Sequence, residues 1–144
     1  MTETSRDHYF STWQRAAQEN GESEAGSFQE TAEDCSLTFS NPNGPSLAIV
    51  AGRQIVTAER LEVLALGHSG AFSDGQDLDS TLKMVAESGA LAVIPWAFGK
   101  WWSKRGQLVA DSVRQKAADM LYLGDNGGRP RCSPTPSIFR AAES

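Results

Sequence analysis

The chain has 144 residues, of which 40% are hydrophobic and 22% are charged, and its formal net charge is −5. This length and composition are typical of one globular domain with a hydrophobic core. The acidic balance argues against binding to duplex nucleic acid, and the longest apolar stretch, residues 89–98, is too short to span a membrane.

The polar N-terminus lacks the apolar segment of a secretory signal, so the sequence predicts a cytoplasmic protein. Its two cysteines, Cys35 and Cys132, are far apart in the sequence and match no metal-ligand spacing. Two unpaired thiols are the simpler interpretation, and a disulfide between them is the alternative.

The first 34 residues predict a helix followed by a loop. Apolar residues at spacings of three and four indicate an amphipathic helix over residues 5–19, with Thr4 or Ser5 as its N-cap and Gly21 at its end. The acidic stretch that follows, residues 19–34, is expected to be a surface loop.

An antiparallel meander is expected next. Residues 35–39 and 46–50 are short apolar runs on either side of the turn sequence Asn-Pro-Asn-Gly-Pro, which predicts a hairpin. A strand at residues 54–57, a turn at residues 58–60 and a strand at residues 61–66 complete this region.

The remaining chain alternates strand and helix patterns. Leu78, Leu82 and Val85 share one helical face, Asp77 or Asp79 can cap the start of this helix, and Gly89 suits its end. The helix therefore predicts a right-handed βαβ crossover between residues 61–66 and the strand that begins at Leu91. Further predicted elements are a helix at 104–119 with four inward residues, a strand at 120–123 and a helix start at 135–139 capped by Thr135. The four inward residues are Leu108, Val109, Val113 and Ala117.

Unusual residues follow the ends of three of these strands. His68, Trp96 and Asp125 stand at these positions. If the three strands are parallel, all three residues lie at one edge of one sheet, where α/β folds place their binding sites. The sequence therefore predicts a cleft at that edge.

Each of these residues has a functional and a structural interpretation. His68 can act as a base or an anion contact, or face solvent in a turn, and Trp96 can floor a pocket or belong to the core. Lys100 stands in the aromatic and basic segment Gly-Lys-Trp-Trp-Ser-Lys-Arg, which suits phosphate, sugar or single-stranded nucleic acid.

The segment after the last strand carries the strongest local signal. Asp125 can hold a metal or orient a base, Asn126 adds a polar contact, and Arg129 can bind an anion. Ordinary turn chemistry is the alternative, because Asp-Asn-Gly-Gly is also a common turn sequence. The carboxylates at residues 74–79 are better explained by helix capping than by calcium binding.

The order of these segments resembles the later part of the PHP (polymerase and histidinol phosphatase) family of metallohydrolases, over residues 48–130. Residues 48–67 look like that family's Gly-x-Glu strand with its returning strand. Residues 87–99 look like its passage that ends in His-Pro, and residues 122–128 look like its strand that ends in Ser-Asp-Ala-His.

The resemblance implies a metal site that this chain has partly lost. The family's metal-binding Glu falls on Gln54, one His falls near Glu62, another falls on Trp96, and a third falls on Gly127, whereas its final Asp is kept as Asp125. Tryptophan does not ligate metals and glutamine is a poor substitute for a carboxylate. The resemblance therefore implies a divalent metal, if any, at Asp125.

The expected fold is α/β, a PHP-like partial barrel or open sheet in which a helix and meander precede a βαβαβ unit. Residues 1–33 are expected to form the helix and acidic loop, residues 34–130 the sheet core, and residues 131–144 a C-terminal tail. Because a closed barrel normally needs about 200 residues or more, we expect a shortened domain or the later part of a longer one.

Three functions remain open at this stage. The first is a phosphoester hydrolase by descent, with His68 as base, Asp125 as metal ligand, and Lys100 and Arg129 on the phosphate. The second is a non-catalytic domain that binds a phosphorylated or sugar-like ligand through Trp96 and basic residues, with Gln54 and Asn126 as further contacts. The third is a structural subunit whose sheet is completed by a second copy or a partner chain.

Overall fold

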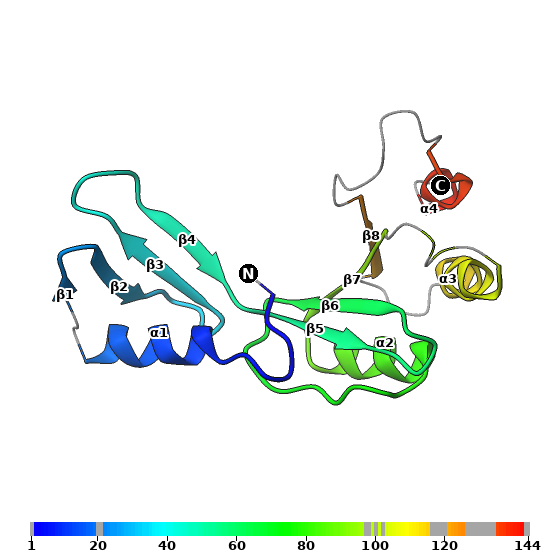
Figure 1. Ribbon diagram of the computed structural model, residues 1–144, viewed down its shortest axis with the longest axis horizontal. Coiled ribbons are helices and arrows are strands. Elements are labelled where there is room, and N and C mark those ends of the chain that lie inside the picture. Colours follow the sequence, from blue (N-terminus) through cyan, green and yellow to red (C-terminus); the bar gives the residue numbers. More distant parts are fainter. Residues whose placement is uncertain are drawn as a thin grey trace.

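A computed structural model of the chain describes residues 2–19, 22–96, 99, 101, 103–115, 121–125 and 135–142. Two open four-stranded sheets lie side by side along the long axis of the molecule (Figure 1). No helix in these residues is long and apolar enough to cross a membrane. The elements are α1 Tyr9–Gln18, β1 Glu22–Ser23, β2 Gly26–Glu30, β3 Ser36–Ser40, β4 Leu47–Val50, β5 Gly52–Val56, β6 Glu62–Leu66, α2 Leu78–Glu87, β7 Leu91–Pro95, α3 Lys104–Arg114, β8 Leu121–Gly124 and α4 Ser137–Ala142.

The first sheet has the order β1-β2-β3-β4 and is antiparallel throughout. The predicted hairpin is confirmed as the pairing of β3 with β4. The predicted surface loop at residues 19–34 is wrong, because it contains β1 and β2. Phe28 is the reason: it pairs with Phe39 across the strands and stacks on Trp13 of α1 at a centroid distance of 5.4 Å. A single aromatic residue in a polar stretch therefore anchors the strand.

Helix α1 covers one side of this sheet but begins later than predicted. Its N-cap is His8, whose side chain makes no capping hydrogen bond, so the predicted caps Thr4 and Ser5 are wrong. Thr4 instead closes a separate turn in which its hydroxyl donates to Asp7 Oδ2 at 2.6 Å and the Asp7 N–H donates to the Thr4 carbonyl at 3.1 Å. The predicted end at Gly21 lies outside the described residues.

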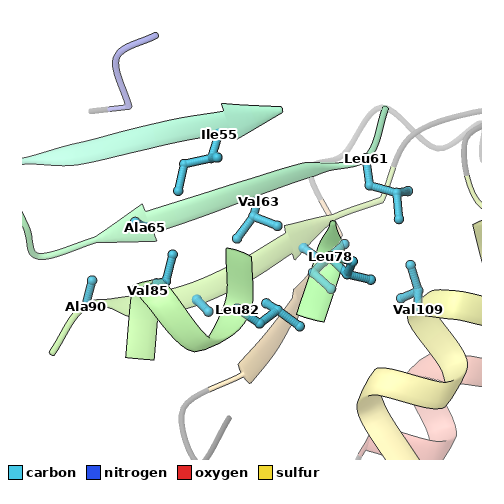
Figure 2. Close-up of a cluster of buried hydrophobic side chains, with 11 residues drawn as sticks. Ile55, Leu61, Val63, Ala65, Leu78, Leu82, Val85, Ala90 and Val109 are labelled. Carbon is cyan, nitrogen blue, oxygen red and sulfur yellow. The ribbon is translucent and has the colours of Figure 1, made fainter. Parts of the chain in front are cut away.

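The second sheet has the order β5-β6-β7-β8 and carries the larger hydrophobic core. The predicted strand–turn–strand at residues 54–66 is confirmed as the antiparallel pair β5 and β6. In Figure 2 the fully buried side chains of Ile55, Val63 and Ala65 lie over those of α2, of which Leu82 and Val85 are 0% exposed. The expected cap is also confirmed, because Asp77 accepts the Ser80 N–H at 2.9 Å.

The expected βαβ crossover is wrong, because β6 and β7 are antiparallel, with Leu66 opposite Leu91. Residues 67–77 form neither helix nor strand and carry the chain back to the end of β5 before α2 begins. There Asp74 Oδ1 accepts the Val56 N–H at 2.8 Å, and the Gln76 carbonyl accepts the Ala58 N–H at 2.8 Å. Because the loop brings the chain back beside the start of β6, α2 runs in the same direction as β6. Strand β7 then runs in the opposite direction.

Strands β7 and β8 are parallel as expected, with Pro95 opposite Gly124. Between them α3 packs Val109 into the core, and Ser112 donates to Asp79 of α2 at 3.3 Å. Leu108 was expected to point inward and is instead 39% exposed. Helix α3 ends at Arg114 with Gln115 as its C-cap, earlier than the predicted end at residue 119. Ala117 and the expected strand start at Met120 lie outside the described residues. The predicted helix start is present as α4, which begins at Ser137, one residue after the proline expected at the first helical position.

The described helices α2, α3 and α4 all cover one face of the second sheet, because Leu82, Val109 and Ile138 belong to or pack against the same core. The opposite face carries the aligned row Gln54, Leu64, Val93 and Tyr122, and Tyr122 is 54% exposed. Over the residues described, β5 and β8 are the two edges of this sheet and do not pair with each other. The fold is thus α/β with an open sheet and no closed barrel; completion of the sheet by a second copy or partner chain stays a prediction.

A buried ion pair joins the N-terminal segment to the second sheet. Glu3 bridges to Arg53 of β5, and its Oε2 lies 2.9 Å from Arg53 Nη1, with side-chain exposures of 3% and 11%. The same guanidinium donates to the backbone carbonyls of Asp7, Ser69 and Gly70. One side chain therefore ties together the N-terminal segment, β5 and the loop after β6.

Candidate ligand-binding cleft

Parallel pairing of β7 and β8 brings Trp96 and Asp125 to the same edge of the second sheet, the one formed by the carboxyl ends of these two strands. Pro95 and Gly124 are the last residues of β7 and β8, they lie opposite each other, and the Trp96 N–H donates to the Gly124 carbonyl at 2.7 Å. Trp96 and Asp125 are the next residue of each strand. The sequence therefore placed these two residues correctly relative to each other.

A cleft of about 570 Å³ opens beside this edge and is lined by residues of both α3 and α4. This volume lies within the usual range for small-molecule sites, about 300–1,000 Å³. The lining comes from the end of β7, the loop before α3, α3 itself and the start of α4. These residues are Trp96, Trp101, Ser103, Gly106, Gln107, Ala110, Asp111, Arg114, Pro136, Ser137 and Ile138.

Two indoles give the cleft its apolar surface. Trp96 is only 5% exposed, so it is a buried residue, and it also lines the cavity. Trp101 is half-buried, packs against the hydrophobic core and stacks on Phe139 of α4 with a centroid distance of 5.5 Å and an interplanar angle of 26°. These contacts with Phe139 and the core restrict the orientation of Trp101 in the absence of a ligand.

The loop that carries Trp101 is fixed closely against α3. A Cβ atom on Gly106 would lie 2.1 Å from the Trp101 carbonyl oxygen, so only glycine permits this approach. Arg105 Nη2 donates to the Gly99 carbonyl at 3.2 Å. Ser103 has φ 59° and ψ −137°, a conformation that costs a residue other than glycine about 1–3 kcal/mol and persists only where its surroundings enforce it.

Helix α3 gives the cleft its polar surface. Ser103, Gln107, Asp111 and Arg114 recur at spacings of four, four and three, so they share one face of the helix and its preceding residue. Arg114 Nη1 donates to Asp111 Oδ1 at 2.9 Å, and both side chains are more than half exposed. Val109 and Ser112 occupy the face that packs on the sheet.

His68 lies away from this cleft. Leu66 pairs with Leu91, which begins β7, whereas Trp96 follows the other end of the same strand. Four residue steps along a strand separate these edges by about 13 Å. The single edge expected for His68, Trp96 and Asp125 is therefore wrong, because the crossover is antiparallel. His68 instead packs against Phe72, at a ring-centroid distance of 5.2 Å.

The other predicted site residues fall in different places. Gln54 lines a second, small cavity of about 50 Å³ together with Ser5, His8, Arg53, Ala71 and Phe72. Asp125 is exposed and is not among the residues that line the large cleft. Lys100, Asn126 and Arg129 lie outside the described residues, as do Trp102, Cys132 and the glycines at 127 and 128.

The positions that the PHP resemblance assigns to metal ligands do not fit a metal centre in this structure. Gln54 lies in the middle of β5, Glu62 begins β6, and the third position is the indole of Trp96. An indole offers a metal no lone pair in the plane of its ring. Over the described part of the chain, no three His, Cys, Asp or Glu side chains come close enough together to hold a metal ion.

Of the carboxylates at residues 74–79, Asp77 caps α2 as expected, whereas Asp74 and Asp79 make other contacts within the fold. The Ser80 backbone N–H and hydroxyl hold the pKa of Asp77 below its usual value of 3.8. Asp74 accepts the Val56 N–H and the Ser5 hydroxyl, and Asp79 accepts the Ser112 hydroxyl. Each of the three therefore has a structural partner.

Sequence reasoning missed the polar side of the cleft. Gln107, Asp111 and Arg114 look like an ordinary solvated helix face, and a four-residue spacing of polar residues has no specificity by itself. The usable signal was their position directly after the aromatic segment at residues 96–102, with Gly106 among them. No protein-family model, curated protein or solved structure matches this chain.

Proposed function

We propose that this protein is a non-catalytic domain that binds a small ligand, phosphorylated or sugar-like, in the cleft between α3 and α4. The observation that carries this proposal is the placement of Trp96. Trp96 is 5% exposed, yet it lines a cavity of about 570 Å³ to which α3 contributes several polar side chains. A concave site that combines apolar surface with a few convergent polar groups is the usual form of a ligand site.

The aromatic and the polar residues of the cleft contribute to binding in different ways. A ring stacked on the indole of Trp101 gains about 0.5–1.5 kcal/mol beyond the burial of its surface. Gln107, Asp111 and Arg114 supply both donors and acceptors along α3, which orient a ligand and select its hydrogen-bonding groups. Since Phe139 already holds Trp101 in place, little side-chain entropy is lost when a ligand binds.

The geometry supports catalysis of phosphoester hydrolysis less well. In that interpretation His68 and Asp125 act on one substrate, but the antiparallel pairing of β6 and β7 puts them at opposite edges of the sheet. General base catalysis requires hydrogen-bond reach, whereas the two ends of β7, beside which these residues lie, are about 13 Å apart. Descent from the PHP family remains a prediction that rests on the order of the sequence segments.

Intrinsic tryptophan fluorescence tests the proposal directly. The protein is titrated with a panel of monosaccharides, disaccharides, sugar phosphates and nucleotides, and each compound is also tested for a rise in melting temperature. A ligand at one hundred times its Kd stabilises the folded state by about 2.7 kcal/mol. We expect at least one class to change the emission and to raise the melting temperature.

Two variants assign the response to the cleft. Trp101→Leu removes the stacking surface and is expected to abolish binding, whereas Trp13→Phe alters an indole that stacks in the first sheet and is expected to leave binding unchanged. A panel with no response, or a response that Trp101→Leu leaves intact, would contradict the proposal. Turnover of a chromogenic phosphoester that His68→Ala abolishes would restore the hydrolase interpretation.

A further inference from the structure

The balance of acidic and basic side chains in the cleft favours uncharged over phosphorylated ligands. This inference rests on the ligand-binding function proposed above. Among the described lining residues, the ionised side chains are Asp111 and Arg114, one acidic and one basic. Their 2.9 Å contact places one charge of each sign side by side, so this part of the cleft wall has no net charge. A phosphate brought to Arg114 would approach the Asp111 carboxylate as well, and the repulsion between the two anions opposes binding.

A hydroxyl group can bind the Asp111 and Arg114 pair without charge repulsion. It donates to a carboxylate oxygen and accepts from a guanidinium N–H, so neighbouring hydroxyls on one ring can bind Asp111 and Arg114 while their ion pair stays intact. Gln107 and Ser103 extend the same mixed donor and acceptor surface along α3. This surface is suited to a ligand with many hydroxyls and no net charge.

The length and shape of the cleft match an extended ligand. From Ser103 to Arg114 is eleven residue steps, which is about 16 Å at the rise of an α-helix. Ala110 lies between the polar residues on the cleft side, and its small side chain leaves room for a ring near the helix. The lining outside α3 includes Trp96, Trp101 and Ile138, which offer apolar contact to the carbon–hydrogen face of a sugar ring.

We propose that the cleft binds an uncharged sugar of more than one ring, with its hydroxyl edge against α3 and its apolar face against Trp96 and Trp101. The proposal assigns a ligand-positioning role to the Asp111 and Arg114 pair. It predicts selectivity for neutral glycans over their phosphorylated counterparts.

The test is isothermal titration calorimetry of the full chain with neutral and phosphorylated sugars in parallel. Maltose and cellobiose represent the neutral class, with glucose as the single ring, and glucose 6-phosphate and maltose 1-phosphate represent the charged class. We expect binding of a disaccharide that changes less than about twofold between about 50 mM and 500 mM salt, because no net charge is neutralised. Asp111→Asn is expected to weaken it about tenfold, the effect of losing one hydrogen bond to a charged acceptor.

A matched control is available on α2. Glu87 forms an exposed pair with Lys83 at 3.9 Å, far from the cleft lining, and Glu87→Gln is expected to leave the titration unchanged. Tighter binding of the phosphorylated sugars, with strong salt dependence, would overturn the inference but leave the proposed ligand-binding function standing. Binding of a neutral disaccharide that Asp111→Asn does not weaken would overturn the inference as well. If no member of either class binds, both proposals fail.

Discussion

Removal of the Glu3 carboxylate should destabilise the fold far more than its place near the N-terminus suggests. Glu3 Oε2 lies 2.9 Å from Arg53 Nη1, and Glu3 Oε1 accepts the Phe10 N–H at 2.6 Å. The Glu3 side chain is 3% exposed, so water cannot replace either contact. The substitution Glu3→Ala therefore leaves a buried guanidinium without its counter-ion and a buried N–H without an acceptor.

The size of the effect follows from these two losses. A hydrogen bond to a charged group contributes about 1.5–3 kcal/mol, and an orphaned buried N–H costs about 1–3 kcal/mol. The three backbone carbonyls that Arg53 also contacts offset part of the loss. We therefore expect Glu3→Ala to lower the free energy of unfolding by about 3–5 kcal/mol, in line with other broken buried pairs. For a chain of this size, that lowers the melting temperature by about 10–15 °C.

Urea denaturation followed by circular dichroism measures the change. Glu3→Gln keeps an acceptor for the Phe10 N–H and should lose only about half as much stability. Glu87→Ala is the control, because its pair with Lys83 is 3.9 Å long and its two side chains are 76% and 68% exposed. That surface pair should contribute less than about 0.5 kcal/mol. The reasoning is refuted if Glu3→Ala and Glu87→Ala destabilise the protein equally.

Three further predictions concern the core, the cleft and the acid range. Leu82 is 0% exposed, so Leu82→Ala should lower the free energy of unfolding by about 2–5 kcal/mol. Leu91 lies on the opposite face of the sheet and is 40% exposed, so Leu91→Ala should lower it by less than about 1 kcal/mol. Equal losses in urea denaturation would show that this face is covered. Gly106→Ala should destabilise α3 instead of giving the usual gain of about 0.5–1 kcal/mol for alanine in a helix, and should weaken ligand binding, because its Cβ would lie 2.1 Å from the Trp101 carbonyl; a stabilised variant with normal binding would contradict the geometry. The pKa of Asp77 is lowered by the Ser80 N–H and hydroxyl, so its contribution to stability is complete above its usual value of 3.8 and is lost as the pH falls through the lower folded value. The difference in melting temperature between the wild type and Asp77→Asn should therefore shrink below about pH 4, and a constant difference would argue against this linkage.

Local signals in the sequence were sufficient wherever a single residue type fixes the backbone. Asp77 predicted the start of α2 and Gly89 its end, and the structure shows the capping hydrogen bond and φ 77° at Gly89. The Asn-Pro-Asn-Gly-Pro turn predicted the β3–β4 hairpin in the same way. These features depend on contacts within a few residues, so tertiary structure has little power to override them.

Strand direction could not be predicted from the same signals. The pattern strand, helix, strand usually indicates a parallel crossover. Here residues 67–77 return the chain along the sheet before α2 begins, held by Asp74 and Gln76 against the end of β5. No local pattern in this loop indicates the return, because its partners are about 18 residues away in the sequence. The candidate site therefore differs from the predicted one, because His68 lies at the opposite end of the strands from Trp96 and Asp125.

Long-range pairing also explains the missed strand and the missed cleft wall. Phe28 forms β2 only because Phe39 and Trp13 lie against it, and its acidic neighbours conceal that contact in the sequence. The polar face of α3 is distinguished from a solvated face only by α4 and Trp101 opposite it. Composition predicts neither arrangement, because both depend on which segments meet in space.

The indole N–H resonances of the 15N-labelled protein test the central claim most directly. The chain has four tryptophans, and single Trp→Phe variants assign their signals. Addition of a neutral disaccharide should shift the signals of Trp96 and Trp101, which line the cleft, and leave that of Trp13, which stacks in the first sheet, unmoved. Unchanged signals from Trp96 and Trp101 across the neutral and the phosphorylated sugars, or a shift confined to Trp13, would contradict the account.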